Sequence, residues 1–162
     1  LRVLLRTKSP LLYLGGIKMI LLSNTTAQTL QPGQAITFDD IILHSGNGEC
    51  HKRNTSAVKL STNGVYEVSF TGNIASLTAA TPVQLAVFLG GAELTESTMI
   101  STPATANSFN NVSALTAVKN CCCDYDRITV VNSGTVPVTV AANSALFIKR
   151  ISQGGFNNVS FN

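Results

Sequence analysis

Most of the chain consists of short runs in which apolar and polar residues alternate, and Gly, Pro, Asn and Ser separate the runs. A period of two places the apolar side chains on one face of a β-strand. In the clearest run, residues 64–74, Tyr66 and Phe70 fall on one face, whereas Glu67 and Ser69 fall on the other. We therefore expect a strand here with its aromatic face buried.

The remaining runs predict about ten short strands in total. No stretch of 11 residues keeps a helical period without Gly, Pro or crowding by β-branched residues. Because each strand has one strongly apolar face, we expect an all-β fold in which two antiparallel sheets pack as a sandwich. Residues 44–56 contain two glycines, two asparagines and several charged side chains, so we expect an exposed loop there. The other expected strands are residues 25–30, 35–38, 41–43, 58–60, 83–89, 92–100, 107–119, 126–131, 136–140 and 145–151.

Composition and charge exclude several classes of protein. Hydrophobic residues make up 44% of the 162 residues, which supports a real core and excludes general disorder. The formal net charge is +3, but residues 1–18 hold four of the eleven basic residues and no acidic one. The rest is nearly neutral and has no basic stripe, so we expect no nucleic-acid partner.

The two ends of the chain are expected to lie outside the domain. We interpret residues 1–18 as a non-domain leader or an upstream translated stretch, with a degenerate export signal or a short anchoring segment as alternatives. Pro10 and Lys18 interrupt the apolar run that a membrane-spanning helix needs, so no stable membrane insertion is expected. We assign one domain to residues 19–151 and a flexible tail to residues 152–162.

The sequence offers no enzyme motif. It has no nucleophile elbow, no P-loop and no dinucleotide fingerprint, and its eight carboxylates are scattered. We therefore expect a protein that is not an enzyme and that needs no cofactor. A metal-dependent enzyme built on a sandwich stays as a remote alternative, and it would require a cleft lined by His44 and His51.

The cysteines are the one chemical oddity. Cys50 stands beside His51, and Cys121, Cys122 and Cys123 are consecutive. Structural zinc is possible, but the C-x-x-C spacing typical of zinc sites is absent. A disulfide from Cys50 to one of the three, or free thiols throughout, are the alternatives. The candidate zinc ligands are His44, Cys50, His51, Cys121 and Cys123, and calcium ligands could come from Asp124 and Asp126.

Four motifs occur in an order that resembles a known superfamily. Residues 64–70 have the form G-x-Y-x-V-x-F, a hairpin turn follows at residues 90–91, and an apolar strand covers residues 144–148 near the end. Residues 24–38 read as a first strand and its return. This order resembles the globular heads of the tumour necrosis factor and complement first-component superfamily over residues 22–151. It is most similar to bacterial and bacteriophage members, such as the head of the collagen-like spore-surface protein and small trimeric phage-fibre heads.

The resemblance implies a TNF-like jelly roll of about ten strands that forms a homotrimer. It implies that Tyr66, Phe70, Phe88 and Phe147 lie either in the core or at the three-fold axis. The implied function is structural or attachment: a head on the virion surface, as a head fibre, capsid decoration or fibre tip, with virion or cell-surface proteins and glycans as partners. A bacterial exported surface or spore-coat head is the alternative. We expect binding at the loops of residues 44–56 and 101–108.

Overall fold

The computed structural model describes residues 18–46, 49–121 and 126–152, and almost every element in these residues is a β-strand. One short 3-10 helix, η1 (Thr95–Ser97), interrupts them. The predicted all-β class is therefore confirmed. The strands are β1 (Met19–Ser23), β2 (Gln28–Leu30), β3 (Asp40–Ser45), β4 (Glu49–His51), β5 (Val58–Leu60), β6 (Gly64–Ser76), β7 (Val83–Leu89), β8 (Ala92–Glu93), β9 (Met99–Ser101), β10 (Asn110–Asn120), β11 (Arg127–Val131), β12 (Val138–Val140) and β13 (Ala145–Ser152).

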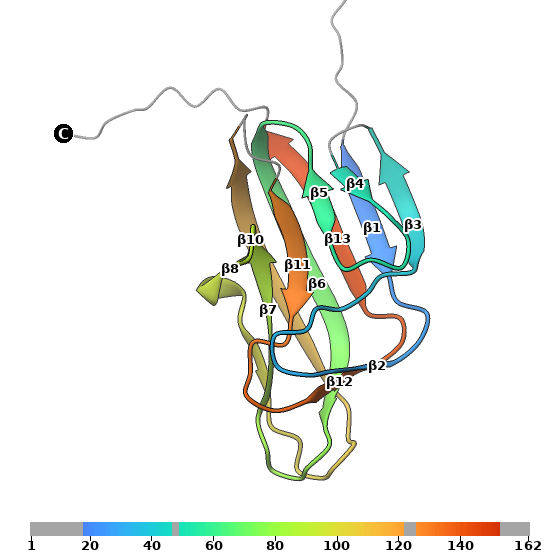
Figure 1. The fold of residues 1–162 in the computed structure, drawn as a ribbon, viewed down its shortest axis with the longest axis vertical. Helices are drawn as coiled ribbons and strands as arrows, with labels where there is room; N and C mark the ends of the chain where they lie inside the picture. Colours follow the sequence, from blue (N-terminus) through green and yellow to red (C-terminus); the bar gives the residue numbers. More distant parts are fainter. Residues whose placement is uncertain (1–17, 47–48, 122–125, 153–162) are drawn as a thin grey trace, which may run out of the picture.

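The strands form two sheets, which lie as the two layers of a sandwich (Figure 1). The seven-stranded sheet has the order β2-β12-β6-β13-β1-β3, and β10 also pairs with β6. The six-stranded sheet has the order β4-β5-β11-β7-β8, and β9 also pairs with β7. Neighbouring strands are antiparallel throughout the described registers, as the sequence predicted.

The core lies between the inner faces of the two sheets, and strand β6 shows why the alternation in the sequence produces it. Tyr66, Val68 and Phe70 are fully buried, whereas Glu67 and Ser69 point to the outer face. Burying a large apolar side chain stabilises a fold by about 1.5–3 kcal/mol. The face predicted from the sequence to be buried is therefore the one that holds the sheets together.

The hairpin between β7 and β8 is formed as predicted. Gly90 and Gly91 connect the two strands with φ values of 59° and 87°. Both values lie in the left-handed region, which fits the right-handed twist of a two-residue hairpin and strongly favours glycine.

The predicted strand at residues 92–100 is wrong in its middle, where the helix η1 separates β8 from β9. The cause is the buried side chain of Ser97. Its hydroxyl accepts a hydrogen bond from the backbone N–H of Val87 at 2.8 Å and donates to the carbonyl oxygen of Leu94 at 2.6 Å. A serine that bonds nearby backbone groups competes with a strand ladder.

The predicted loop at residues 44–56 is also partly wrong. Strand β3 continues through His44 to Ser45, and β4 pairs with β5 in the register Cys50 to Lys59. An edge strand is held through its backbone, so polar side chains do not prevent it.

The ends of the described chain join the sheet. The backbone N–H of Arg150 donates to the carbonyl oxygen of Lys18 at 2.9 Å, beside the pairing of β1 with β13. Most of the expected leader, residues 1–18, and tail, residues 152–162, lie outside the described residues. Within the described part of the chain, there is no helix with the length and apolar character to span a membrane.

Candidate functional site

The outer face of the seven-stranded sheet carries a row of residues that crosses five strands and is apolar at every position except Ser69. Leu43, Leu21, Phe147, Ser69 and Leu115 are paired one after another from β3 to β10. Leu115 is 67% exposed and Leu43 is 45% exposed, while Phe147 and Leu21 are half-buried. We call these five residues the outer row. An exposed apolar group that continues across strands is typical of an interaction surface.

The residues named beside the outer row are either small or belong to a pair of opposite charges. Ser113 and Ala117 flank Leu115 along β10. On the neighbouring strands, Glu67 lies directly opposite Lys149, so this pair places opposite charges side by side. Opposite charges across a strand pair attract one another. The face therefore presents short side chains and a locally balanced charge around an apolar centre.

The structure distributes the four aromatic candidates over three places. Tyr66 and Phe70 lie in the core. The hydroxyl of Tyr66 is bonded to Thr62, to whose carbonyl oxygen it donates at 2.8 Å. Phe147 belongs to the outer row, and Phe88 is half-buried on the outer face of the opposite, six-stranded sheet. Only Phe147 is thus placed to contact another molecule through the seven-stranded sheet.

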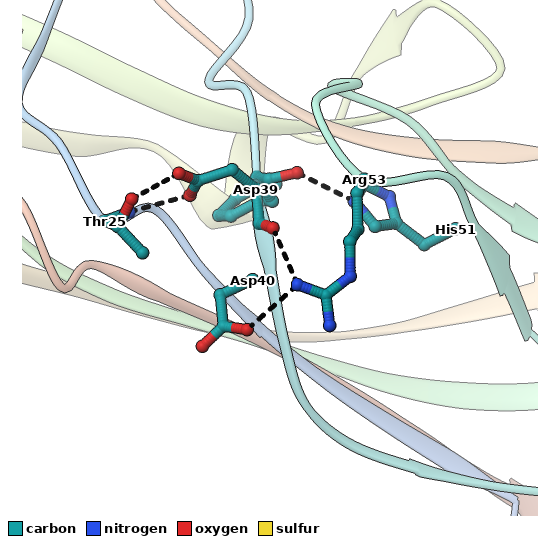
Figure 2. A network of polar contacts seen from close by, with 6 residues as sticks. Thr25, Asp39, Asp40, His51 and Arg53 are labelled. Carbon is teal, nitrogen blue, oxygen red and sulfur yellow. Dashed lines mark hydrogen bonds and ion pairs between the residues drawn. The ribbon is translucent and has the colours of Figure 1, made fainter.

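A polar cluster joins the loop after β1 and the turn after β4 to the start of β3 (Figure 2). The backbone N–H of Thr25 donates to Asp39 Oδ1 at 2.7 Å, and its hydroxyl donates to Asp39 Oδ2. Both bonds lower the pKa of Asp39 from its ordinary value of 3.8, and the bond from the Thr25 side chain contributes more than the bond from its backbone. Arg53 lies 3.4 Å from Asp40, in an exposed ion pair. The cluster ties two loops together.

The metal candidates do not assemble into a site in the described residues. Both ring nitrogens of His51 lie 3.0 Å from carbonyl oxygens, Nδ1 from Ala57 and Nε2 from Phe38. The ring is thus committed to the backbone. His44 lies exposed on β3. Within residues 18–46, 49–121 and 126–152, no group of three His, Cys, Asp or Glu side chains is arranged to hold a metal ion.

The described cysteines carry free thiols. Cys50 and Cys121 are both exposed. Two other expected ligands, Cys123 for zinc and Asp124 for calcium, lie outside the described residues, as does Cys122. Asp126 is half-buried, and its carbonyl oxygen accepts a hydrogen bond from the N–H of Leu60 at 2.8 Å.

The two loops expected to bind lie at opposite ends of the sandwich (Figure 1). The first contains the ends of β3 and β4. The second follows β9 and is fastened to the loop before β7, because the N–H of Ala80 donates to the carbonyl oxygen of Pro103 at 2.9 Å. They therefore do not form one surface.

Comparison with known proteins identifies the fold. No family model and no curated protein matches the sequence. Solved structures do match. The globular domain of zebrafish complement 1qA protein has a TM-score of 0.64 at 13% identity, over 85% of this chain and 99% of that one. The Eiger TNF of S. frugiperda has a TM-score of 0.66 at 10% identity, over 90% and 99%. Murine APRIL has a TM-score of 0.60 at 14% identity, over 83% and 99%. The predicted TNF-like jelly roll is confirmed.

Proposed function

We propose that this protein is a non-enzymatic homotrimeric head, in which the outer face of the seven-stranded sheet packs against two further copies of the chain. The observation that supports the proposal is the outer row, which ends on β10 with Leu115 at 67% exposure. Removing apolar surface from water is favourable by about 25 cal/mol per Å², before the entropic cost of association is subtracted. An isolated subunit would leave this row in solvent.

The composition of the face suits a contact between identical copies. Interface cores are depleted in charge, and the outer row has none. Ser69 lies between Phe147 and Leu115, so a short side chain separates two larger apolar groups in the row. A heterologous contact repeated around a three-fold axis closes into a ring. Two neighbours per subunit then cover the face.

The proposed role of the trimer is display on a virion surface, as a head fibre, capsid decoration or fibre tip. The resemblance of residues 22–151 to bacteriophage heads supports this placement. Three copies present three identical sites, and simultaneous engagement multiplies the effect of weak contacts with a cell-surface partner. The attachment role needs no catalytic group.

The first experiment is the solution mass of the full chain, measured by light scattering on a sizing column. The chain has a mass of 17.1 kDa, and we expect a species of about three times that mass. The mass should not change with reductant or chelator, since the outer row contains neither thiol nor metal ligand. A monomer under all conditions contradicts the proposal.

The place of display needs a separate experiment. Purified phage particles, host cells and spores are analysed by quantitative mass spectrometry for peptides of this chain. Recovery with particles that survives a stringent salt wash supports the virion placement. Recovery with the bacterial surface or the spore coat instead overturns it and favours the alternative head.

A further inference from the structure

A hollow of about 470 Å³ lies on the outer face of the six-stranded sheet, which is the face of the sandwich opposite the outer row. Its volume lies within the range of about 300–1,000 Å³ that is typical of small-molecule sites. Segments far apart in the sequence meet there. They are the turn after β2, the β7–β8 hairpin, and the end of β11 with the residues that follow it. In the proposed trimer, this hollow would face outward on every subunit.

Three side chains of different chemistry stand side by side at the hollow. Phe88 on β7 is paired with Glu93 on β8 and, on its other side, with Thr129 on β11. All three line the hollow. A carboxylate, an aromatic ring and a hydroxyl are thus aligned across three neighbouring strands.

Another part of the lining is fixed by the hydrogen bonds of Asn132, whose side chain is fully buried. Its Nδ2 donates to the carbonyl oxygens of Leu30 at 3.0 Å and Val136 at 2.9 Å, and its Oδ1 accepts from the N–H of Gly134 at 3.0 Å. Nearby, Gln84 Nε2 donates to Ser133 Oγ at 2.8 Å. A wall fixed before the ligand arrives reduces the ordering cost of binding.

The charge of the hollow restricts the ligand. Among the described residues that line the hollow, Glu93 alone is charged, so it repels phosphate and other anions. The polar face of a neutral sugar can donate hydroxyls to a carboxylate, and its C–H face can lie on the electron-rich face of a ring. The volume suits a single sugar ring with part of its neighbour.

We propose that this hollow binds a neutral saccharide. The sugar ring stacks on the side chain of Phe88, and the sugar hydroxyls donate to the carboxylate of Glu93 and form a hydrogen bond with the hydroxyl of Thr129. The inference deepens the proposed attachment function, and it rests on that function for its biological meaning. It adds a binding site that lies away from both of the loops expected from the sequence.

The test is a titration of the 15N-labelled full chain with neutral methyl glycosides of glucose, galactose, mannose and N-acetylglucosamine, followed by NMR. We expect at least one to shift the amide signals of Gly33, Thr129 and Gly134 saturably, with a Kd of about 1 mM. The proposal is overturned if none of the four glycosides gives a saturable shift. It is also overturned if shifts appear only with choline, a cation that an aromatic ring beside a carboxylate would bind.

Variants locate the site. Phe88→Ala should weaken binding about tenfold through loss of the stacking surface, and Glu93→Gln about fivefold, because a charged acceptor bonds more strongly than a neutral one. Thr129→Val keeps the shape of its side chain, so it tests the site even if Phe88→Ala fails to fold. Ile100→Ala is the matched control, because Ile100 is 61% exposed and paired with Gln84 on the same sheet but outside the hollow. Equal binding by all four variants overturns the site.

The NMR titration measures glycoside binding by each subunit, whereas light scattering measures the mass of the assembly. A monomer that binds a glycoside therefore contradicts the trimer and supports the saccharide site. A trimer that binds no glycoside supports the assembly and contradicts the saccharide site.

Discussion

Phe147 and Leu115 lie on the same outer face of the seven-stranded sheet, and each is paired with Ser69 from opposite sides of β6. This arrangement makes Leu115 a sensitive position for assembly. Because Leu115 is 67% exposed in the single subunit, Leu115→Asp should leave the fold intact. It would bury a charge in the trimer interface, which is costly. We expect the variant to have the mass of a monomer by light scattering.

Ile100→Asp is the matched control for assembly. Ile100 is 61% exposed, but it lies on the opposite sheet. This variant should stay trimeric with the same mass as the unmodified protein. If Leu115→Asp stays trimeric, or if Ile100→Asp also dissociates, the seven-stranded sheet is not the assembly face.

The alternation in the sequence predicted the faces of the long strands because burial alone decides them. In residues 107–119, a period of two places Val112 and Val118 on the face opposite Leu115 and Ala117, and the structure buries the first pair and exposes the second. The ladder between β6 and β10 runs without a break from Asn110 to Asn120. A regular period of two is sufficient information for such strands.

Other features depend on contacts between distant residues, which the alternation does not encode. Phe88 and Phe147 were both candidates for the core or the three-fold axis, yet they lie on the outer faces of opposite sheets. Residues 33, 91 and 134 line the same hollow on the six-stranded sheet, although they are far apart in the sequence and the hairpin signal at residues 90–91 does not indicate a binding site. Strand β4 forms in a polar segment because its partner β5 supplies the backbone bonds. Sheet membership, unlike strand faces, is decided by tertiary packing.

Asn24 joins the loop after β1 to the loop before β13, and its loss should lower the stability of the fold. The side chain is fully buried. Its Nδ2 donates to the carbonyl oxygens of Thr26 at 2.8 Å and Ala141 at 2.9 Å, and its Oδ1 accepts from the N–H of Ser144 at 2.9 Å. Asn24→Ala removes three hydrogen bonds and leaves the buried N–H of Ser144 without this acceptor, so we expect the free energy of unfolding to fall by about 3 kcal/mol.

Asn110→Ala provides the comparison in urea denaturation. Asn110 is exposed and bonds only to the hydroxyl of Ser101, at 3.0 Å, among its described side-chain contacts. This change should cost no more than about 0.5 kcal/mol. All proteins are compared at one concentration, because the stability of an oligomer depends on concentration. If Asn24→Ala lowers the free energy of unfolding no more than Asn110→Ala does, the hydrogen bonds of Asn24 contribute little to stability.

Cys50 and Cys121 should react as ordinary surface thiols. Both are free and exposed. In the native protein, an alkylating reagent is expected to label both positions without reductant, as read by tandem mass spectrometry of the digested chain. Labelling of either residue only after reduction or chelation would reveal a disulfide or a bound metal, and would contradict this prediction.

The contact between Thr25 and Asp39 should make the structure sensitive to acid. The hydrogen bonds from Thr25 favour the ionised carboxylate and lower the pKa of Asp39 from 3.8. Because the pKa is lower in the folded than in the unfolded protein, the stabilisation is complete above pH 3.8 and is lost as the pH falls through the folded value. An NMR titration of the Asp39 carboxyl carbon measures this pKa directly.

Two variants separate the causes of the shift. Thr25→Val removes the hydroxyl that makes the largest contribution, so the pKa of Asp39 should rise toward its ordinary value. Arg53→Met removes the attraction of the guanidinium, the smallest contribution, and should raise the pKa less. Screening weakens an exposed charge pair, whereas a direct hydrogen bond persists in salt. A larger rise in Arg53→Met than in Thr25→Val would show that charge, and not the hydrogen bond across the two loops, controls Asp39.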